Sequence, residues 1–140
     1  MSTVEPREQG DVMVTTLVFL AALLVASTIL ISASEQWEAR RKAAAAAATM
    51  ARAAAQGDVE LVREGRDGID PDRARRRVRD VLAALDRGDD ETTYSGRILA
   101  IDGPIVTAEA TASVDYTFPV PGFPDRIAGT ASAEAVRGSG

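Results

Sequence analysis

Four carboxylates fall within six residues and are the first candidates for chemistry. They are Asp86, Asp89, Asp90 and Glu91. A calcium loop needs oxygen ligands at alternate positions and a bidentate Glu about twelve residues on, and this spacing is absent. Two carboxylates can also serve as acid and base in hydrolysis, but no aromatic residue is adjacent to any of these four in the sequence. We therefore interpret the group as a solubilising turn.

The densest run of cationic residues could bind a phosphate group or an anionic lipid. It comprises Arg73, Arg75, Arg76, Arg77 and Arg79. No aromatic residue is interleaved to stack on single-stranded nucleic acid. Asp70, Asp72 and Asp80 lie at neighbouring helical turns, so we interpret the run as a solvated helix face paired with these acids.

The composition removes most familiar active sites. The chain has 140 residues with no Cys and no His, which excludes disulfides, Cys/His zinc sites and every imidazole-based triad. Gly65 and Gly68 lack the Lys and the preceding strand of a phosphate loop. We expect no catalytic, cofactor or metal site, and we do not expect an enzyme.

The charge balance argues against nucleic acid as a partner. Lys and Arg number 16 against 21 Asp and Glu, which gives a formal net charge of -5. A negative field repels phosphate backbones. Hydrophobic residues make up 46% of the chain but aromatic residues only 4%, so we expect a thin core with few bulky side chains.

The decisive feature is an uncharged apolar run at residues 12–34. At 1.5 Å per residue, a helix of this length measures about 34 Å and crosses a hydrocarbon core of about 30 Å. Hydroxyls within the run can bond to the helix's own carbonyls. We predict a transmembrane helix over 12–34, preceded by a short segment at 1–11.

A cleaved secretory signal is the alternative interpretation of this run. Ser32, Ala33 and Ser34 supply the small residues of a cleavage site. The start is poor, however, because Arg7 stands among acidic residues, and the apolar run exceeds the usual length of about 7 to 15 residues. We favour an uncleaved anchor.

Aromatic and cationic residues follow the run and are predicted to lie at the membrane interface. They are Trp37, Arg40, Arg41 and Lys42. An indole suits the headgroup layer, and long cationic stems reach outward to it. Counted alone, these cations favour a cytoplasmic C-terminal side, but the rule is weaker for one span before a long translocated domain. Charge therefore leaves the orientation open.

An Ala-rich segment at 35–56 continues without Gly or Pro. We expect the membrane helix to extend through it as one stalk of about 45 residues, roughly 67 Å long. Small side chains let a neighbouring helix approach closely. The residues predicted to pack there against partner helices are Ala44, Ala47, Ala48, Ala51 and Ala55. A solvated stalk held by helix propensity alone stays open as the alternative.

Glycines mark a hinge at 57–70 between this stalk and a head at 71–140. A helix is predicted over 71–87, since Pro71 suits the first helical position behind an Asp70 cap. Its apolar residues recur at amphipathic spacing until Gly88.

Three strands are predicted at 92–101, 105–118 and 126–137. The middle strand alternates small apolar and polar residues, so one face is buried and the other is solvated. Asp102-Gly103 indicates a hairpin, in a loop that Pro104 should make longer or less regular than two residues. The fold class is α+β: a long transmembrane helix and Ala-rich stalk, then one helix covering a three-stranded antiparallel sheet.

The order of these elements resembles a known family. Glu8-Gln9-Gly10, the apolar helix, ARRKAAAAAATMARAAAQ and the strand pattern IVTAEATASVDYTFPVPGFPDRIAGTASAEAV are similar to TadE/TadG-like proteins of the tight-adherence (Flp) pilus system, in a short actinobacterial form. The resemblance implies a minor pilin-like or pilus-assembly protein of the cell membrane. Its N terminus would be cytoplasmic, its head extracellular, and its partners other pilus or secretion membrane proteins.

Processing is a point where the chain departs from that pattern. Family members resemble prepilins, in which a peptidase cuts after a Gly and a Glu stands fifth in the mature chain. A cut between Gly10 and Asp11 would leave Thr15 in fifth place. Without that carboxylate a neighbour's new amino terminus stays unpaired in an apolar bundle, so an uncut assembly protein fits better than a fibre subunit.

Two function hypotheses from different classes follow. In the first, the chain is a non-enzymatic membrane protein that acts through helix and head contacts with partners. In the second, a head from about Asp70 onward is a membrane-tethered or secreted binding module that folds and binds alone. A homo-oligomer is compatible with both.

Overall fold

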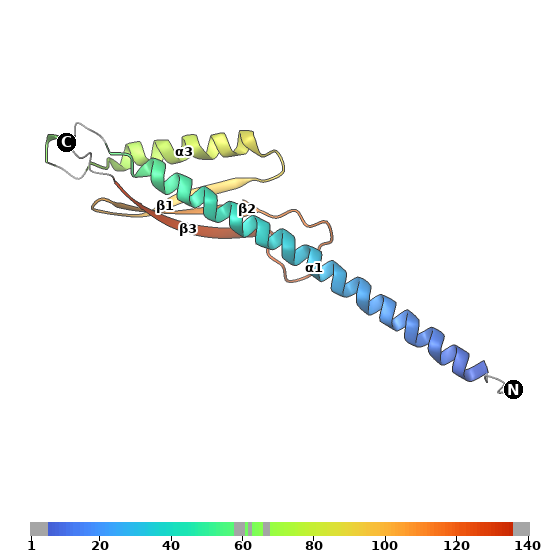
Figure 1. The fold of residues 1–140 in the computed structure, drawn as a ribbon. Coiled ribbons are helices and arrows are strands. Elements are labelled where there is room, and N and C mark those ends of the chain that lie inside the picture. Colours follow the sequence, from blue (N-terminus) through green and yellow to red (C-terminus); the bar gives the residue numbers. More distant parts are fainter. Residues whose placement is uncertain (1–5, 58–60, 62, 66–67, 136–140) are drawn as a thin grey trace.

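The computed structural model describes residues 6–57, 61, 63–65 and 68–135. The elements are α1 (Pro6–Ala54), α3 (Pro71–Gly88), β1 (Tyr94–Asp102), β2 (Ile105–Ser113) and β3 (Arg126–Glu134). The strands form one antiparallel sheet in the order β1-β2-β3. Figure 1 shows a small head at one end of α1, with the N-terminal half of the helix projecting away from it. The α+β class, with a long apolar helix and a three-stranded antiparallel sheet, is confirmed.

Helix α1 runs through 49 residues without a break. No Gly or Pro follows Gly10 within it, so nothing in the chain interrupts the helical hydrogen bonds. Several of its hydroxyls bond within the helix: Thr15 Oγ1 donates to the Asp11 carbonyl at 2.7 Å, and Ser27 Oγ donates to that of Leu23 at 2.8 Å. The predicted continuation of the apolar helix into the Ala-rich segment is confirmed.

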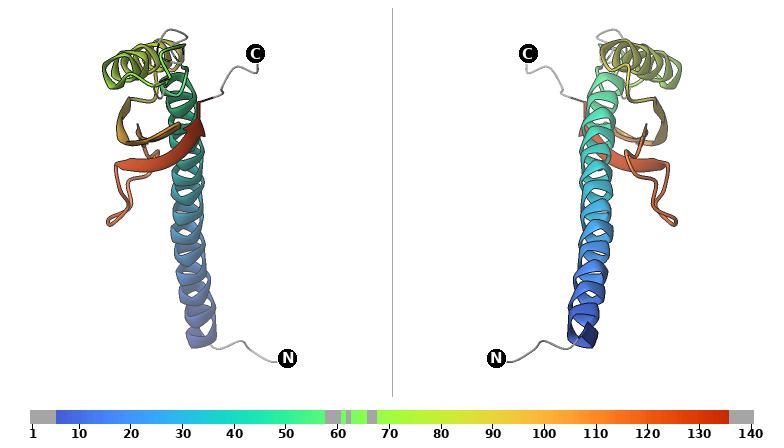
Figure 2. Two further views of the ribbon diagram at one scale, coloured as in Figure 1. Left: turned by 90° about the vertical axis from the view of Figure 1, so that its left-hand side faces the viewer. Right: turned by 90° about the vertical axis from the view of Figure 1, so that its right-hand side faces the viewer.

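The Ala-rich half of α1 is not a free stalk, because it packs on the head. It contacts β2, β3 and α3, and Figure 2 shows it running past the sheet with α3 at the same end of the molecule. Its buried residues are Ala39, Ala43, Ala46, Ala47, Met50, Ala51, Ala54 and Ala55. The segment at 35–56, which was predicted to be a stalk before a head at 71–140, therefore packs on that head in the structure.

Strand alternation turns a face of small residues toward the helices. On β2 the side chains of Val106, Ala108, Ala110 and Ala112 are fully buried, as the alternation predicted. Strand β2 ends at Ser113 and not at 118, because the chain beyond it leaves the sheet and turns to α1. The last two residues predicted for the third strand lie outside the described residues.

Helix α3 begins where the sequence predicted. The Asp70 side chain accepts a hydrogen bond from the Asp72 backbone N–H at 3.0 Å, and Pro71 follows this cap. Helix α3 contacts α1 and β1 but does not cover the whole sheet. The expectation that this helix covers the small-residue face is corrected: α1 covers β2 and β3, because only its Ala side chains allow that close an approach.

Two glycines of the sheet show how close the approach is. A Cβ atom on Gly129 would stand 2.6 Å from the Ala44 nitrogen and 2.8 Å from the Ala43 carbonyl carbon. A Cβ on Gly96 would collide with Met50 and stand 2.8 Å from the Glu109 carbonyl oxygen. The backbone of α1 therefore rests on β3, and the buried Met50 side chain fills the space over β1.

The connection between β1 and β2 is short, whereas residues 114–125 separate β2 from β3. Asp102 pairs with Ile105, so the first hairpin has a two-residue turn, made possible by Gly103 at a φ of 56°; the longer or less regular loop expected from Pro104 is not formed. The hinge predicted at 57–70 falls partly outside the described residues, at 58–60, 62 and 66–67. Residues 1–5 of the N-terminal segment also lie outside them.

The contact between Gly129 and α1 gives a stability prediction. Gly129→Val should lower the free energy of unfolding by about 2–3 kcal/mol, because the helix backbone must move to admit the side chain. Thermal denaturation of the full chain in detergent, followed by circular dichroism, measures the change.

Ala128→Val is the matched control, since Ala128 is exposed on the same strand and faces away from α1. It should change stability by no more than about 0.5 kcal/mol. Equal effects of the two substitutions would contradict the close packing of α1 on β3.

Candidate functional site at the junction of α1 and the head

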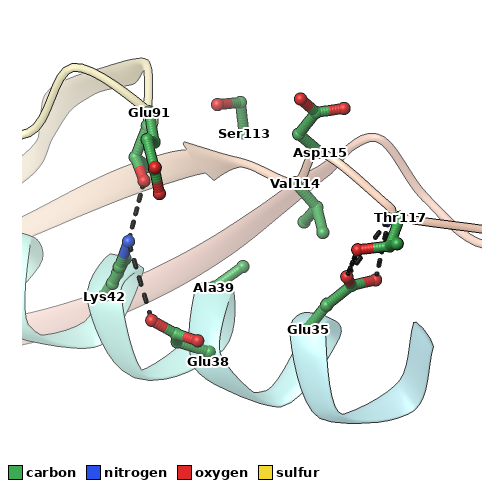
Figure 3. Close-up of a pocket in the computed structure, with 10 residues that line it drawn as sticks. Glu35, Glu38, Ala39, Lys42, Glu91, Ser113, Val114, Asp115 and Thr117 are labelled. Atoms are coloured by element: carbon green, nitrogen blue, oxygen red, sulfur yellow. Dashed lines mark hydrogen bonds and ion pairs between the residues drawn. The ribbon is translucent and has the colours of Figure 1, made fainter. Parts of the chain in front are cut away.

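A shallow pocket of about 270 Å³ lies where α1 passes from its apolar half into the head. We call it the junction pocket. Its lining comes from α1, from the α3–β1 connection, and from the end of β2 with the chain that follows it; Figure 3 shows these side chains around the pocket. The residues are Glu35, Glu38, Ala39, Lys42, Glu91, Thr92, Ser113, Val114, Asp115 and Thr117. The chemistry of this pocket depends on how its charged groups are paired.

Lys42 ties α1 to the α3–β1 connection. Its Nζ lies 3.0 Å from Asp89 Oδ2, 2.9 Å from Thr92 Oγ1 and 3.8 Å from Glu38 Oε1. The other Asp89 oxygen accepts the backbone N–H groups of Glu91 and Thr92 at 3.1 and 3.2 Å. One carboxylate thus shapes the turn after α3 and holds the lysine.

The charges of this pair reinforce one another. The hydrogen bond from Lys42, with help from Thr92 and the Glu91 backbone, lowers the pKa of Asp89 to about 2. The same bond raises the pKa of Lys42 above its usual value, against the opposing effect of burial. Both groups are therefore ionised near neutral pH, and the pair acts as a clasp between α1 and the head.

The chain between β2 and β3 makes a second set of contacts with α1. The Glu35 carboxylate accepts the Thr117 backbone N–H at 3.1 Å and its hydroxyl at 2.5 Å. Ser32 Oγ donates to the Phe118 carbonyl at 2.8 Å, and Ser32 is fully buried. We call this segment, residues 114–125, the strap loop. It holds the head to the last turn of the uncharged run.

The predicted interface residues divide into two groups. Trp37 is 63% exposed, and Arg40 and Arg41 are also exposed on α1, so all three can reach a membrane surface. Lys42 is instead engaged within the head by the Asp89 carboxylate. The Lys42 side chain that was predicted for the membrane interface is thus bonded to an acid of the α3–β1 connection.

The alanines predicted to pack against partner helices also divide. Ala47, Ala51 and Ala55 are buried within the chain's own head, Ala48 is half-buried and Ala44 is exposed. Only the last two have side-chain surface left for a partner. At the other end, the predicted processing residues Gly10 and Asp11 lie exposed within the helix.

The two charged runs have structural roles here. Asp86 Oδ1 accepts the Tyr94 N–H at 3.1 Å, so with Asp89 two acids of the expected solubilising turn support the start of β1. In the cationic run Arg75 pairs with Asp72 at 3.2 Å and Arg73 with Asp70 at 3.7 Å, as interpreted. Among the described residues no group of three or more acids, His or Cys could hold a metal ion.

Sequence reasoning missed the contacts that build this junction. The pair Lys42 and Asp89 is separated by 47 residues, and Ser32 and Phe118 by 86. Lys42 stands out in the sequence only as the one lysine among 16 cations, and this does not identify its partner.

Comparison with known proteins adds no family. No protein-family model, no curated protein and no solved structure matches the chain. Function is therefore inferred from the geometry of α1 and the junction.

The Lys42–Asp89 clasp predicts a pH dependence. Because the pKa of Asp89 is lowered on folding, from 3.8 to about 2, its stabilising effect is complete above the higher value and is lost as the pH falls through the lower one. Asp89→Asn should therefore lower the free energy of unfolding by about 1 kcal/mol at pH 6, since the pair is partly exposed. It should also make the free energy of unfolding fall less steeply as the pH is lowered. Denaturation midpoints measured from neutral pH down through this range test this.

Lys42→Met should flatten the acid profile in the same way, because it removes the donor that lowers the Asp89 pKa. Asp90→Asn is the control, since Asp90 is the exposed neighbour of Asp89. A wild-type profile in the Lys42→Met chain would contradict the clasp.

Proposed function

We propose that this chain is a non-enzymatic single-pass membrane protein that serves as a minor pilin-like or assembly component of a tight-adherence (Flp) pilus or a related secretion apparatus. It acts through contacts of α1 and the head with partner proteins. One observation carries the membrane and assembly part of the proposal: a single unbroken helix has a bare apolar half and a half that forms the core of the head. The pilus system itself comes from the resemblance of the sequence to TadE/TadG-like proteins.

The bare half of α1 supports a membrane location. Among the described residues α1 is the helix long and apolar enough to cross a membrane, by length and composition. Its large side chains are open to the surroundings, with Leu24 at 69% and Leu30 at 70% exposure. An uninterrupted apolar surface of this size needs lipid or other apolar helices to cover it.

The rigid junction supports an assembly role over a tethered binding module. A tether needs no fixed angle between span and head, whereas a component that positions partners does. Here α1 enters the head core without a hinge and is clasped at Lys42 and Glu35. A head that began near Asp70 would also lose Met50 and the alanines that cover its sheet, so an independently folded module has less support.

The start of α1 supports an uncut assembly component over a fibre subunit. The Thr15 hydroxyl is bonded to the Asp11 carbonyl of its own helix, and it carries no charge to offer a neighbour's amino terminus. A chain cut after Gly10 would therefore bring an unpaired charge into an apolar bundle.

The membrane topology is tested by protease treatment of intact cells that carry a C-terminal tag, together with the mass of the purified chain. We expect a digested tag and a full-length mass, because the head lies outside and no segment is removed. A chain beginning at Asp11 would contradict the uncut component and favour a processed subunit. A tag that stays protected in cells with a permeable wall would place the head in the cytoplasm.

Contacts of α1 with partners are tested by adding charge to its exposed small residues. Ala44→Glu combined with Ala45→Glu should abolish co-purification with the other membrane components of the pilus apparatus, because both side chains point away from the head. Circular dichroism and the protease assay should remain as in the wild type.

Ala83→Glu combined with Ala84→Glu is the matched control, since these alanines are exposed on α3. It should leave co-purification intact. If the α1 pair also leaves it intact, the helix-contact part of the proposal is wrong.

A further inference from the structure

We propose that the strap loop is a second membrane contact: its tip lies in the headgroup and outer acyl layer of the bilayer that α1 spans. The inference rests on the proposed membrane span and adds a lipid-binding surface to the head. In Figure 2 the loop, drawn in orange, is the part of the head that reaches furthest toward the N-terminal half of α1.

The height of the loop along α1 is set by two contacts. The Phe118 carbonyl is bonded to Ser32, which belongs to the last turn of the uncharged run, and Thr117 is bonded to Glu35, the first charge after it. Trp37 lies five residues beyond Ser32, or about 7.5 Å further from the membrane centre along a helix axis. The Phe118 backbone therefore lies deeper than the indole that marks the interface.

Burial around Ser32 shows that the loop covers this turn of α1 on one side. Ser32 is fully buried, and Ile31 is 42% exposed, while Leu30 keeps 70%. The apolar surface of the helix thus continues onto the loop at the same level. Any bilayer that covers Leu30 and Ile31 also meets the loop beside them.

The composition of the loop suits that layer. Nine consecutive residues, 116–124, carry no charge, and they stand between Asp115 and Asp125. Three of them are prolines, which bring no N–H group that would need a partner away from water. The Phe118 side chain is 47% exposed, and aromatic rings favour the membrane interface.

The loop is also held in shape before it meets lipid. The Tyr116 hydroxyl donates to the Pro124 carbonyl at 2.7 Å, and its ring packs on Phe123 with centroids 5.9 Å apart. At the base the Val114 N–H donates to the Asp125 carbonyl at 2.8 Å. Little conformational entropy is lost on insertion, because the tip is already ordered.

Lipid is the occupant that the position favours. The loop stands next to the span at the same height, so lipid surrounds it without any further partner. The tip itself, residues 116–124, carries no charge, so zwitterionic lipid is sufficient to cover it. Together, span and loop give the head two contacts with the bilayer and so hold α1 at one tilt.

Depth-dependent quenching of tryptophan in the full chain tests this. Native Trp37, the only tryptophan, is one probe, and Phe118→Trp in a Trp37→Phe background is the second. The chains are placed in phosphatidylcholine vesicles whose acyl chains carry bromine near the carbonyl end. We expect stronger quenching at position 118 than at position 37, because 118 lies deeper. Val120→Trp replaces Phe118→Trp if circular dichroism shows that the latter is misfolded.

Two further probes separate the loop from the span. Leu20→Trp, within the apolar half of α1, should be quenched by bromine near the methyl end, and Thr130→Trp, exposed on β3, should not be quenched. If position 20 is quenched and position 118 is not, the span stands and the loop contact is wrong. If position 20 is not quenched, the proposed membrane span itself fails. Emission at 118 that ignores bromine but changes with protein density would assign the loop to a second copy and overturn lipid as the occupant.

Discussion

The short distance between α1 and the sheet is the constraint on which the rest of the structure depends. Alanine and glycine each bury little apolar area, so a core built from them holds only if the backbones come together. Gly129 lets β3 touch the backbone of α1 at Ala43 and Ala44, and Met50 supplies the bulk above Gly96. The Ala-rich half of α1 is therefore the central element of the head.

This packing fixes the position of the head along α1. Contacts occur in order at Ser32, Lys42, Ala44, Met50 and Gln56, where the last residue's carbonyl accepts from Arg77. Ala54, where α1 ends, lies 20 residues beyond Ser34, which is about 30 Å along a helix. Arg77 of the arginine run on α3 contacts Gln56, so this part of the run lies far along α1 from the strap loop and from the lipid contact proposed for it.

The parts of the fold that depend on local signals could be predicted from the sequence. Helix α1, the Asp70 cap of α3 and the alternating strands follow from charge, capping and period. The buried face of the Ala-rich segment could not be predicted, because alanine on every side leaves no periodic pattern. The clasp of Lys42 and the strap loop join residues far apart in sequence, and only the tertiary fold brings them together.

The junction satisfies its own charges, and this bears on the kind of component that the chain is. Glu35 is bonded by both donors of Thr117, and Lys42 is bonded by Asp89 and Thr92. A subunit that polymerises through its helix needs an unpaired charged side chain that can bind a neighbouring subunit. Position 15, where the resemblance to prepilins would place a Glu, holds the uncharged Thr15. Here the charged groups that follow the apolar run, Glu35 and Lys42, fix the head on α1. That arrangement suits a protein that presents a head at a set height and angle to its partners.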